Sequence, residues 1–175
     1  MRFADGTIRI VPLESSHDRA GFSCGSEPLD RYLQTQATQD IRRGVASAFV
    51  AVATGAPAQI LGFFTLSAAS IVPADLPTDT AKRLPRHPVP AALIGRLAVD
   101  RSAAGRGLGA ILLADAVDKA MAAAETVAMA AIVVDPIDDA ARSFYAAFGF
   151  RSLQGPQHRM FLVLARRSSR PEGAA

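Results

Sequence analysis

The feature that most constrains this sequence is a strand-like segment that leads into three alternating glycines. Residues 96–100 read Arg-Leu-Ala-Val-Asp, and Gly105, Gly107 and Gly109 follow just before a long helix-like stretch. The first amides of a helix have no intrahelical partner and carry partial positive charge, so they bind phosphates. Glycine lets the backbone approach such an anion closely. The pattern therefore predicts a phosphate-binding turn at a helix N-terminus, with an ordinary tight turn as the alternative.

Two common nucleotide-binding loops do not fit this turn. No Lys-Ser or Lys-Thr pair follows the glycines, which excludes a Walker loop. The spacing G-x-G-x-G also differs from the G-x-G-x-x-G of the Rossmann fingerprint.

The N-terminal half shows alternating strand and helix signals. Residues 7–12 alternate apolar and polar side chains, as in a strand. Ser26 is a suitable cap for a helix over 27–43, where Leu29, Leu33, Ala37 and Ile41 recur every four residues. Two β-rich runs, 45–53 and 59–67, flank a turn at 54–57 and predict a hairpin.

The rest of the chain continues this mixed pattern. A proline-rich connection covers 72–90, and long connections of this kind are often functional. Beyond it we expect a strand at 92–99, a helix at 108–124, a strand at 126–134 and a helix at 138–148 that Gly149 ends. Phe150 and 158–164 would close the sheet. The prediction is one α/β (α+β) domain over 1–165 with six or seven strands, three or four helices and a flexible tail at 166–175.

A second signal lies about forty residues after the glycines. Phe144 and Phe148 stand one helical turn apart and are best interpreted as core anchors. Tyr145 falls beside this stripe, so its ring can pack while its hydroxyl reaches a cleft. The alternative is a half-buried tyrosine with a purely structural role.

Together these two motifs, in this order, resemble the GNAT N-acetyltransferases over roughly residues 45–164. The resemblance implies a central, mostly antiparallel twisted sheet and acetyl-CoA as co-substrate. Leu97 and Val99 would offer main-chain groups to the pantetheine arm and the acetyl carbonyl, and Tyr145 would protonate the departing thiolate. The full set of cofactor-binding residues implied is Leu97, Ala98, Val99, Ala104, Gly105, Arg106, Gly107, Leu108, Gly109, Ala110, Asp138 and Phe144.

The sequence departs from the family pattern at two of these positions. Ala104 stands where Gln or Arg is often found, and Asp138 stands where Asn is often found early in the later helix. Either change would weaken or rearrange contacts to CoA. The backbone cradle of the glycine turn depends on neither side chain.

The implied chemistry is direct attack of a neutral amine on the thioester, with backbone donors stabilising the oxyanion. A tyrosine with an ordinary pKa of ~10 that donates to a thiolate of ~8.5 transfers its proton uphill by about 2 kcal/mol. This favours transfer concerted with C–S cleavage.

A narrower resemblance begins at the N-terminus with the motif Phe22-x-Cys24-Gly25-x-x-x-Leu29-Asp30-Arg31-Tyr32-Leu33. Together with residues 62–67 (GFFTLS) and 95–100 (GRLAVD), it resembles the GNAT toxins of type II toxin–antitoxin pairs. Those toxins acetylate the amino group of aminoacyl-tRNA and block translation. The resemblance implies aminoacyl-tRNA as substrate, a ribbon-helix-helix antitoxin as partner and a homodimer.

Amine chemistry agrees with such a substrate. An α-amine titrates near ~7.7–8.0, so part of it is neutral at cellular pH without a strong base, whereas a lysine amine near ~10.4 would need more help. A tRNA substrate also favours a basic surface. The candidates are Arg42, Arg43, Lys82, Arg83, Arg86, Arg96 and the arginines of the tail, with simple solvation as the alternative because the net charge is only +3.

Other functional classes find little support. The longest apolar runs are about eight residues, against the ~20 that cross a bilayer, so we expect a cytoplasmic protein without membrane spans. One cysteine, Cys24, and the scattered His17, His87 and His158 make a poor metal site, and we expect none. Cys24 has no evident histidine partner and is best interpreted as a packed thiol.

Two alternatives to the toxin stay open. A housekeeping GNAT that acetylates a small amine or a peptide N-terminus would share the CoA site and differ in its acceptor cleft. A non-catalytic module that binds CoA or a protein is favoured by the departures at Ala104 and Asp138 and disfavoured by the presence of Tyr145.

Overall fold

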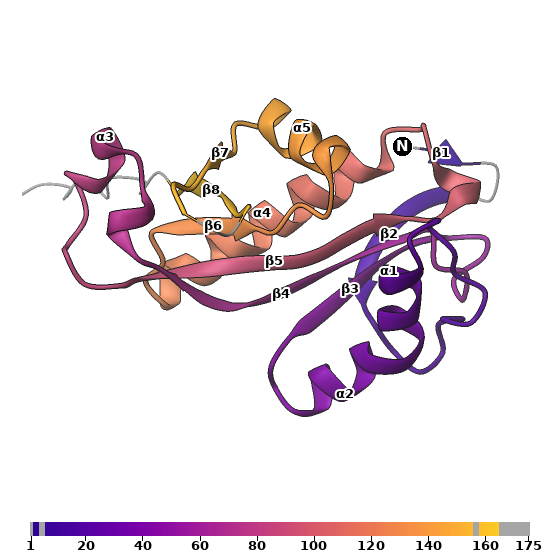
Figure 1. The fold of residues 1–175 in the computed structure, drawn as a ribbon. Helices are drawn as coiled ribbons and strands as arrows, with labels where there is room; N and C mark the ends of the chain where they lie inside the picture. Colours follow the sequence, from indigo (N-terminus) through magenta and orange to yellow (C-terminus); the bar gives the residue numbers. More distant parts are fainter. Residues whose placement is uncertain (1, 4–5, 156–157, 165–175) are drawn as a thin grey trace, which may run out of the picture.

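The computed structural model describes residues 2–3, 6–155 and 158–164 (Figure 1). They form one sheet in the order β1-β2-β3-β4-β5-β6-β8-β7. All neighbouring strands are antiparallel except β5 and β6, which are parallel. The strands are β1 (Arg2–Phe3), β2 (Gly6–Pro12), β3 (Ser47–Ala53), β4 (Gly62–Ile71), β5 (Val89–Val99), β6 (Ala131–Val134), β7 (Arg151–Ser152) and β8 (Met160–Val163).

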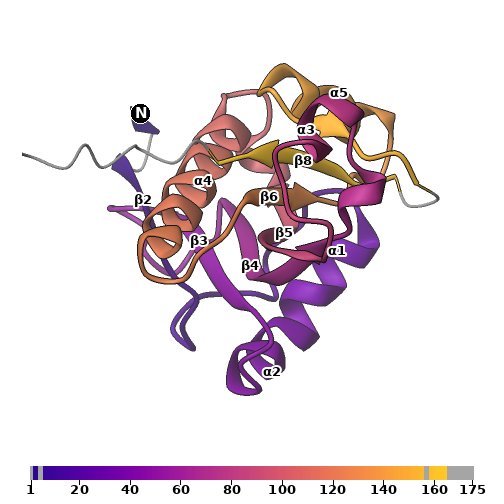
Figure 2. The ribbon, with the colours of Figure 1, turned by 90° about the vertical axis from the view of Figure 1, so that its left-hand side faces the viewer.

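Helices cover both faces of this sheet. On one face lie α4 (Leu108–Thr126) and α5 (Asp139–Ala147); on the other lie α1 (Glu27–Arg31) and α2 (Ala37–Arg42) (Figures 1 and 2). The one-turn helix α3 (Thr78–Ala81) lies near β7 and β8. Two of the three buried clusters lie between these layers: Leu108, Leu112 and Tyr145 belong to the first face, and Tyr32 and Leu33 belong to the second.

The expected fold class is confirmed. Six strands have four or more residues, and β1 and β7, of two residues each, extend the sheet at its edges to eight. The single parallel pair gives the mostly antiparallel sheet that the family resemblance implied. The tail expected at 166–175 lies outside the described residues, and the boundary at residue 165 remains a prediction.

The first helix deviates from regular α geometry in its middle. A π-helical turn, Tyr32–Gln36, connects α1 to α2, and the Ala37 amide donates to the Tyr32 carbonyl. The four-residue spacing of the apolar side chains is wider than the 3.6 residues of an α-helical turn. The wider π turn takes up this difference and keeps Tyr32, Leu33 and Ala37 buried against the sheet.

Several predicted boundaries were wrong. The connection between β3 and β4 runs from 54 to 61 rather than 54 to 57, because the Asp18 and Gln59 segments form a bridge before β4 begins. Helix α4 extends to Thr126, so the strand expected at 126–134 begins only at Ala131. Strand β5 begins at Val89, inside the proline-rich connection, because β4 continues to Ile71 and pairs with it.

Candidate active site

The central feature of the site is the place where β5 continues past its parallel neighbour. Strands β5 and β6 pair only from Ala91–Ala131 to Ile94–Val134. Strand β5 then runs on to Val99 while it remains paired with β4 on its other edge. Among the described residues, no strand pairs with this last part of β5 on the β6 side. The sheet therefore opens into a wedge between β5 and β6.

A β-bulge lies where this wedge begins. The pairing of β4 with β5 skips Gly95, because Thr65 faces Arg96 and the next residue, Leu66, faces Ile94. A Cβ at position 95 would lie 3.2 Å from the Thr65 hydroxyl, so a larger residue fits poorly. Bulges bend a strand and increase its twist. Gly95 thus marks the point at which β5 turns away from β6.

The orientation of the β5 main chain identifies its free groups. The Asp100 amide donates to the Leu61 carbonyl beside β4, at 2.9 Å. Main-chain groups of successive strand residues point to opposite edges, so Ala98 also faces β4. Leu97 and Val99 therefore direct their N–H and C=O groups into the wedge. Three residues of β5 were expected to bind acetyl-CoA. Of these, only Ala98 directs its main-chain groups to β4 rather than into the wedge.

The glycine turn follows directly and opens α4. Gly105 and Gly107 have φ of 71° and 80°, in the left-handed region that favours glycine. A Cβ at either position would meet no atom within 4 Å, so the space beside the turn is open. Helix α4 has 19 residues, and the first amides of such a helix lack intrahelical acceptors. The amides of Leu108, Gly109 and Ala110 can therefore bind an anion there.

Asp100 caps the one-turn 3-10 helix (Arg101–Ala103) that precedes the glycines, a role that the sequence analysis missed. Its carboxylate accepts hydrogen bonds from the Ser23 amide at 2.8 Å, the Ser102 amide at 2.9 Å and the Ser102 hydroxyl at 2.7 Å. Burial raises the pKa of Asp100, but the hydrogen bonds from Ser102 and Ser23 outweigh it and keep the pKa below its usual range. The signal in the sequence was the Asp-x-Ser pattern at 100–102, because an aspartate often accepts a hydrogen bond from the main chain two residues later.

The N-terminal motif, residues 22–33, contacts the segment that contains Asp100 and Arg101. Asp30 accepts hydrogen bonds from the Cys24 amide at 2.8 Å and the Ser23 hydroxyl at 3.3 Å. The Arg101 amide donates to the Ser23 carbonyl at 2.9 Å. Gly25 has a φ of 91°, and its Cα faces the Arg101 side chain. The two motifs recognised separately in the sequence therefore meet around Ser23.

Tyr145 is buried on the α4 side of the sheet, in the cluster that borders the wedge. It belongs to the buried cluster that contains Ile94 and Val134, the last paired residues of β5 and β6. Leu97 and Val99 pack against this cluster. The ring contacts Phe144 and Phe150, with centroids 5.3 and 5.5 Å away. The expected packing of the Tyr145 ring is present: the side chain is buried, and two aromatic neighbours fix its ring.

Burial and the nearby Asp135 charge raise the pKa of Tyr145 to about 12. The phenol therefore stays protonated at neutral pH and is a weaker acid than free tyrosine. Transfer of its proton to a free thiolate of pKa ~8.5 would be uphill by about 5 kcal/mol. For a tyrosine with an ordinary pKa of ~10, the same proton transfer costs only about 2 kcal/mol. Proton donation at this position has to be concerted with departure of the thiolate.

Phe144 and Asp138 support the arrangement from α5. The Phe144 ring lies 3.7 Å from the position of a Cβ on Gly109, so α5 packs directly on the first turn of α4. Asp138 caps α5: its carboxylate accepts a hydrogen bond from the Ala141 amide at 2.7 Å. The aspartate that replaces the family's usual asparagine thus has a local structural role. The side chains of Ala104 and Arg106 lie exposed beside the turn.

Comparison with known families agrees with this geometry. Residues 21–150 match the acetyltransferase (GNAT) family. The chain belongs to the GNAT family. The matched residues contain the wedge, the glycine turn and Tyr145, so the acetyltransferase activity and the acetyl-CoA requirement expected from the sequence are those of the family.

Similar proteins narrow the comparison within the GNAT family. A tRNA-acetylating toxin of Mycobacterium tuberculosis is 38% identical over 152 residues, which cover 86% of this chain and 89% of the toxin. The structure of AtaT complexed with acetyl-methionyl-tRNAfMet has a TM-score of 0.84 at 29% identity, covering 90% and 95% of the two chains. AtaTR bound with AcCoA has a TM-score of 0.78 at 29% identity, covering 89% and 93%.

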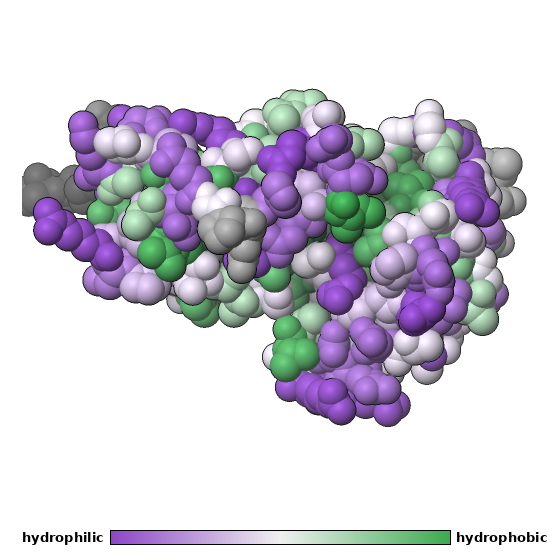
Figure 3. Space-filling view, viewed as in Figure 1, coloured by the Kyte–Doolittle hydropathy of each residue, from purple (hydrophilic) through white to green (hydrophobic). Residues whose placement is uncertain are grey.

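The predicted tRNA-binding arginines occupy separate parts of the GNAT fold. Arg42 and Arg43 are exposed at the end of α2. The surface at the place of α2, at the lower edge of the molecule, is largely hydrophilic (Figure 3). Arg83 and Arg86 are exposed after α3, away from α2 (Figures 1 and 2). Arg96 is half-buried on β5 and stacks on the Tyr32 ring, with 3.5 Å from its guanidinium carbon to the ring centroid. Only Arg96 belongs to the strand that forms the wedge.

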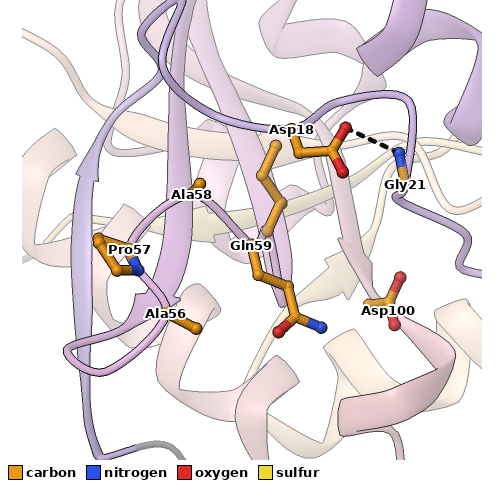
Figure 4. A pocket seen from close by; sticks show the side chains of 8 residues that line it. Asp18, Gly21, Ala56, Pro57, Ala58, Gln59 and Asp100 are labelled. Carbon is orange, nitrogen blue, oxygen red and sulfur yellow. Dashed lines mark hydrogen bonds between the residues drawn. The ribbon is translucent and has the colours of Figure 1, made fainter.

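A depression of about 460 Å³ lies beside Asp100, between the N-terminal loop and the β3–β4 connection (Figure 4). Asp18 and Asp100 line it together with Gly21 and residues 56–60. Asp18 accepts a hydrogen bond from the Gly21 amide at 3.1 Å. Two carboxylates disfavour a phosphate here, in contrast to the open glycine turn.

The remaining candidate residues have structural environments. Burial raises the pKa of Cys24 to about 11, so its thiol stays protonated and unreactive. His17 accepts a hydrogen bond from the Glu14 amide at 2.9 Å, and His87 and His158 are exposed. No group of metal-ligating side chains is found within the described part of the chain. None of the described helices is long and apolar enough to cross a membrane.

Proposed function

We propose that this protein is a toxin that transfers the acetyl group of acetyl-CoA to the α-amino group of aminoacyl-tRNA and thereby blocks translation. The observation that carries the proposal is the geometry of β5. Its free edge at Leu97 and Val99 leads into the left-handed glycine turn of α4, and Tyr145 is buried in the cluster against which Leu97 and Val99 pack. The similarity to tRNA-acetylating toxins supports the choice of acceptor.

In this proposal the glycine turn holds the pyrophosphate of acetyl-CoA. The amides of Leu108, Gly109 and Ala110 are the donors, and Gly105 and Gly107 leave the space for the anion. Leu97 and Val99 bind the pantetheine arm and the acetyl carbonyl through their main chains. Neither Ala104 nor Asp138 is needed for these contacts, because all of them come from the backbone.

The reaction forms a C–N bond between the α-amine and the acetyl carbon and breaks the C–S bond of the thioester. Tyr145 gives its proton to the sulfur as the bond breaks, the amine releases a proton to solvent, and the Tyr145 phenolate regains a proton from solvent. An α-amine suits a site without a dedicated base, because its pKa of ~7.7–8.0 leaves part of it neutral near pH 7.

The partners follow from the same comparison. A Tyr-to-Phe mutant of the toxin AtaT has been solved bound to the C-terminus of the antitoxin AtaR. We infer that this chain, too, is neutralised by an antitoxin, one of the ribbon-helix-helix class, and that it forms a homodimer and acts in the cytoplasm, where its substrate is. Co-expression with the neighbouring antitoxin gene and light scattering of the purified protein test these points.

The decisive experiment supplies purified protein with labelled acetyl-CoA and total charged tRNA, with deacylated tRNA as the control. We expect label on charged tRNA only. Label on small amines or peptides but not on charged tRNA would instead establish a housekeeping acetyltransferase. Binding of acetyl-CoA without transfer to any acceptor would indicate a non-catalytic module.

A further inference from the structure

A second cavity lies on the face of the sheet opposite to the glycine turn. It has a volume of about 330 Å³, within the range of small-ligand sites. Its lining comes from α1, the π-helical turn and β5: Glu27, Pro28, Arg31, Tyr32, Gln36 and Arg96. Arg96 is the direct chain neighbour of Leu97. The cavity therefore opens beside the wedge in which acetyl transfer is proposed, but from the other side of β5.

The two sides of β5 can be distinguished by their packing. Leu97 and Val99 pack against the cluster of α4 and α5, on the side of the proposed cofactor site. Arg96 and Ala98 alternate with them and point to the side of α1 and α2, where Arg96 covers Tyr32. A ligand that contacts Arg96 thus approaches from the face that the cofactor does not use.

The guanidinium of Arg96 stacks on the Tyr32 ring, and its N–H groups remain available to a ligand. The donors of a guanidinium lie in its own plane rather than on its faces. The Tyr32 hydroxyl donates to the Asp40 carboxylate at 3.0 Å, which fixes the ring from behind. Among the described residues, no carboxylate forms an ion pair with Arg96. The stack orients a cation without neutralising it.

The charges around the cavity favour an anion. Glu27 forms an ion pair with Arg31 across one helical turn. Two arginines and one glutamate in the lining leave one positive charge, and the positive group without an ion pair is Arg96. An apolar amino-acid side chain would gain little in such a lining, whereas a phosphate matches a planar guanidinium well.

We propose that this cavity binds the 3′-terminal nucleotide of the charged tRNA and that Arg96 contacts its phosphate. In an aminoacyl ester one ribose joins the reacting amine to the nearest phosphodiester, so a phosphate accompanies the amine into the site. Tyr32 and Asp40 position the guanidinium. Acetyl-CoA and tRNA would then meet at the free edge of β5 from opposite faces of the sheet. This inference rests on the proposed aminoacyl-tRNA substrate.

The test compares Arg96→Gln with wild-type protein on two acceptors that differ in phosphate. With charged tRNA we expect KM to rise at least tenfold while kcat at saturation stays within twofold. With an amino-acid methyl ester, which has no phosphate, kcat/KM is expected to stay within twofold. The slope of log KM against log salt with charged tRNA should decrease by about one. Arg96→Lys keeps the charge without the planar fork and should give an intermediate KM.

Arg9→Gln is the matched control, because it also removes one arginine charge, but Arg9 is exposed on β2 and does not line the cavity. Its effect on KM for charged tRNA should be under threefold. An equal rise in KM for charged tRNA in both variants would overturn the proposal. It would also be overturned if Arg96→Gln lost activity equally with both acceptors, left KM unchanged or bound acetyl-CoA more weakly than the wild type. If the wild type acetylates the ester but not charged tRNA, the proposed substrate fails and the subsite fails with it. Normal transfer to charged tRNA by Arg96→Gln overturns the subsite alone.

Discussion

The Asp100 carboxylate accepts a hydrogen bond from the Ser23 amide at 2.8 Å, although 77 residues separate the two in the chain. This contact joins the loop before α1 to the turn that opens α4. Asp30 and Arg101 bind the same loop through Cys24 and Ser23. The helical layer on one face of the sheet is thereby coupled to the proposed cofactor turn on the other.

Replacement of Asp100 by Asn should destabilise the protein by about 1–3 kcal/mol near neutral pH, because partly buried amide donors lose a charged acceptor. The folded-state pKa lies below the usual 3.8, so the stabilisation is present above that pH and is lost as the pH falls through the lower folded pKa. The difference between wild type and variant in urea unfolding should therefore shrink below about pH 4. Ser102→Ala, which removes one of the three donors, should cost less. A difference that does not change with pH would contradict this account.

Substitution of Gly107 by Ala should weaken acetyl-CoA binding at least tenfold, because the added methyl group enters the space proposed for the pyrophosphate. The left-handed φ of 80° should also cost about 1–2 kcal/mol of stability. Gly44 is a matched control: its φ is 68°, its Cβ would also meet no atom within 4 Å, and it follows α2. Calorimetry should show weaker acetyl-CoA binding for Gly107→Ala alone. Similar binding by both variants would argue against a phosphate at the turn.

Tyr145→Phe should lower kcat at least tenfold while the Kd of acetyl-CoA stays within twofold, because the buried ring keeps its contacts and only the proton donor is lost. With a pKa of about 12, Tyr145 should stay protonated through the assay range, so wild-type kcat should show no alkaline loss near pH 10. Single-turnover rates from pH 6 to 10.5 measure both effects. A wild-type rate that falls with an apparent pKa near 10, and a variant that lacks this fall, would show that the phenol is not shifted.

The two exposed arginine pairs can be separated by their salt dependence. Arg42→Gln with Arg43→Gln, and Arg83→Gln with Arg86→Gln, should each raise KM for charged tRNA if that pair contacts phosphates. Each lost contact should reduce the slope of log KM against log salt by about 0.7–0.9. We expect both pairs to contribute, because each is exposed and none of the four forms an ion pair among the described residues. If replacement of a pair changes neither KM nor the salt slope, that pair is solvated and does not contact the tRNA.

The sequence alone determined the features of this protein that are set within a few residues. The glycines at 105 and 107 required a left-handed turn, and the apolar pattern after them required a helix. The spacing of Phe144 and Tyr145 identified the packed aromatic side chains of α5. The interpretation of Phe148 as a core anchor was wrong, because it follows the last turn of α5 and is 44% exposed. These features produce the family resemblance because each is set within a few residues.

Tertiary structure decided how these parts become a site. The wedge exists because β6 ends at Val134 while β5 runs on to Val99, and no local pattern specifies where a strand loses its partner. Asp100 meets Ser23, and Arg96 lies on Tyr32, only because the sheet brings distant segments together. Even the pKa of Tyr145 depends on burial by the surrounding strands and helices. Short-range propensities determine the elements, whereas long-range packing determines which groups remain free to bind a ligand.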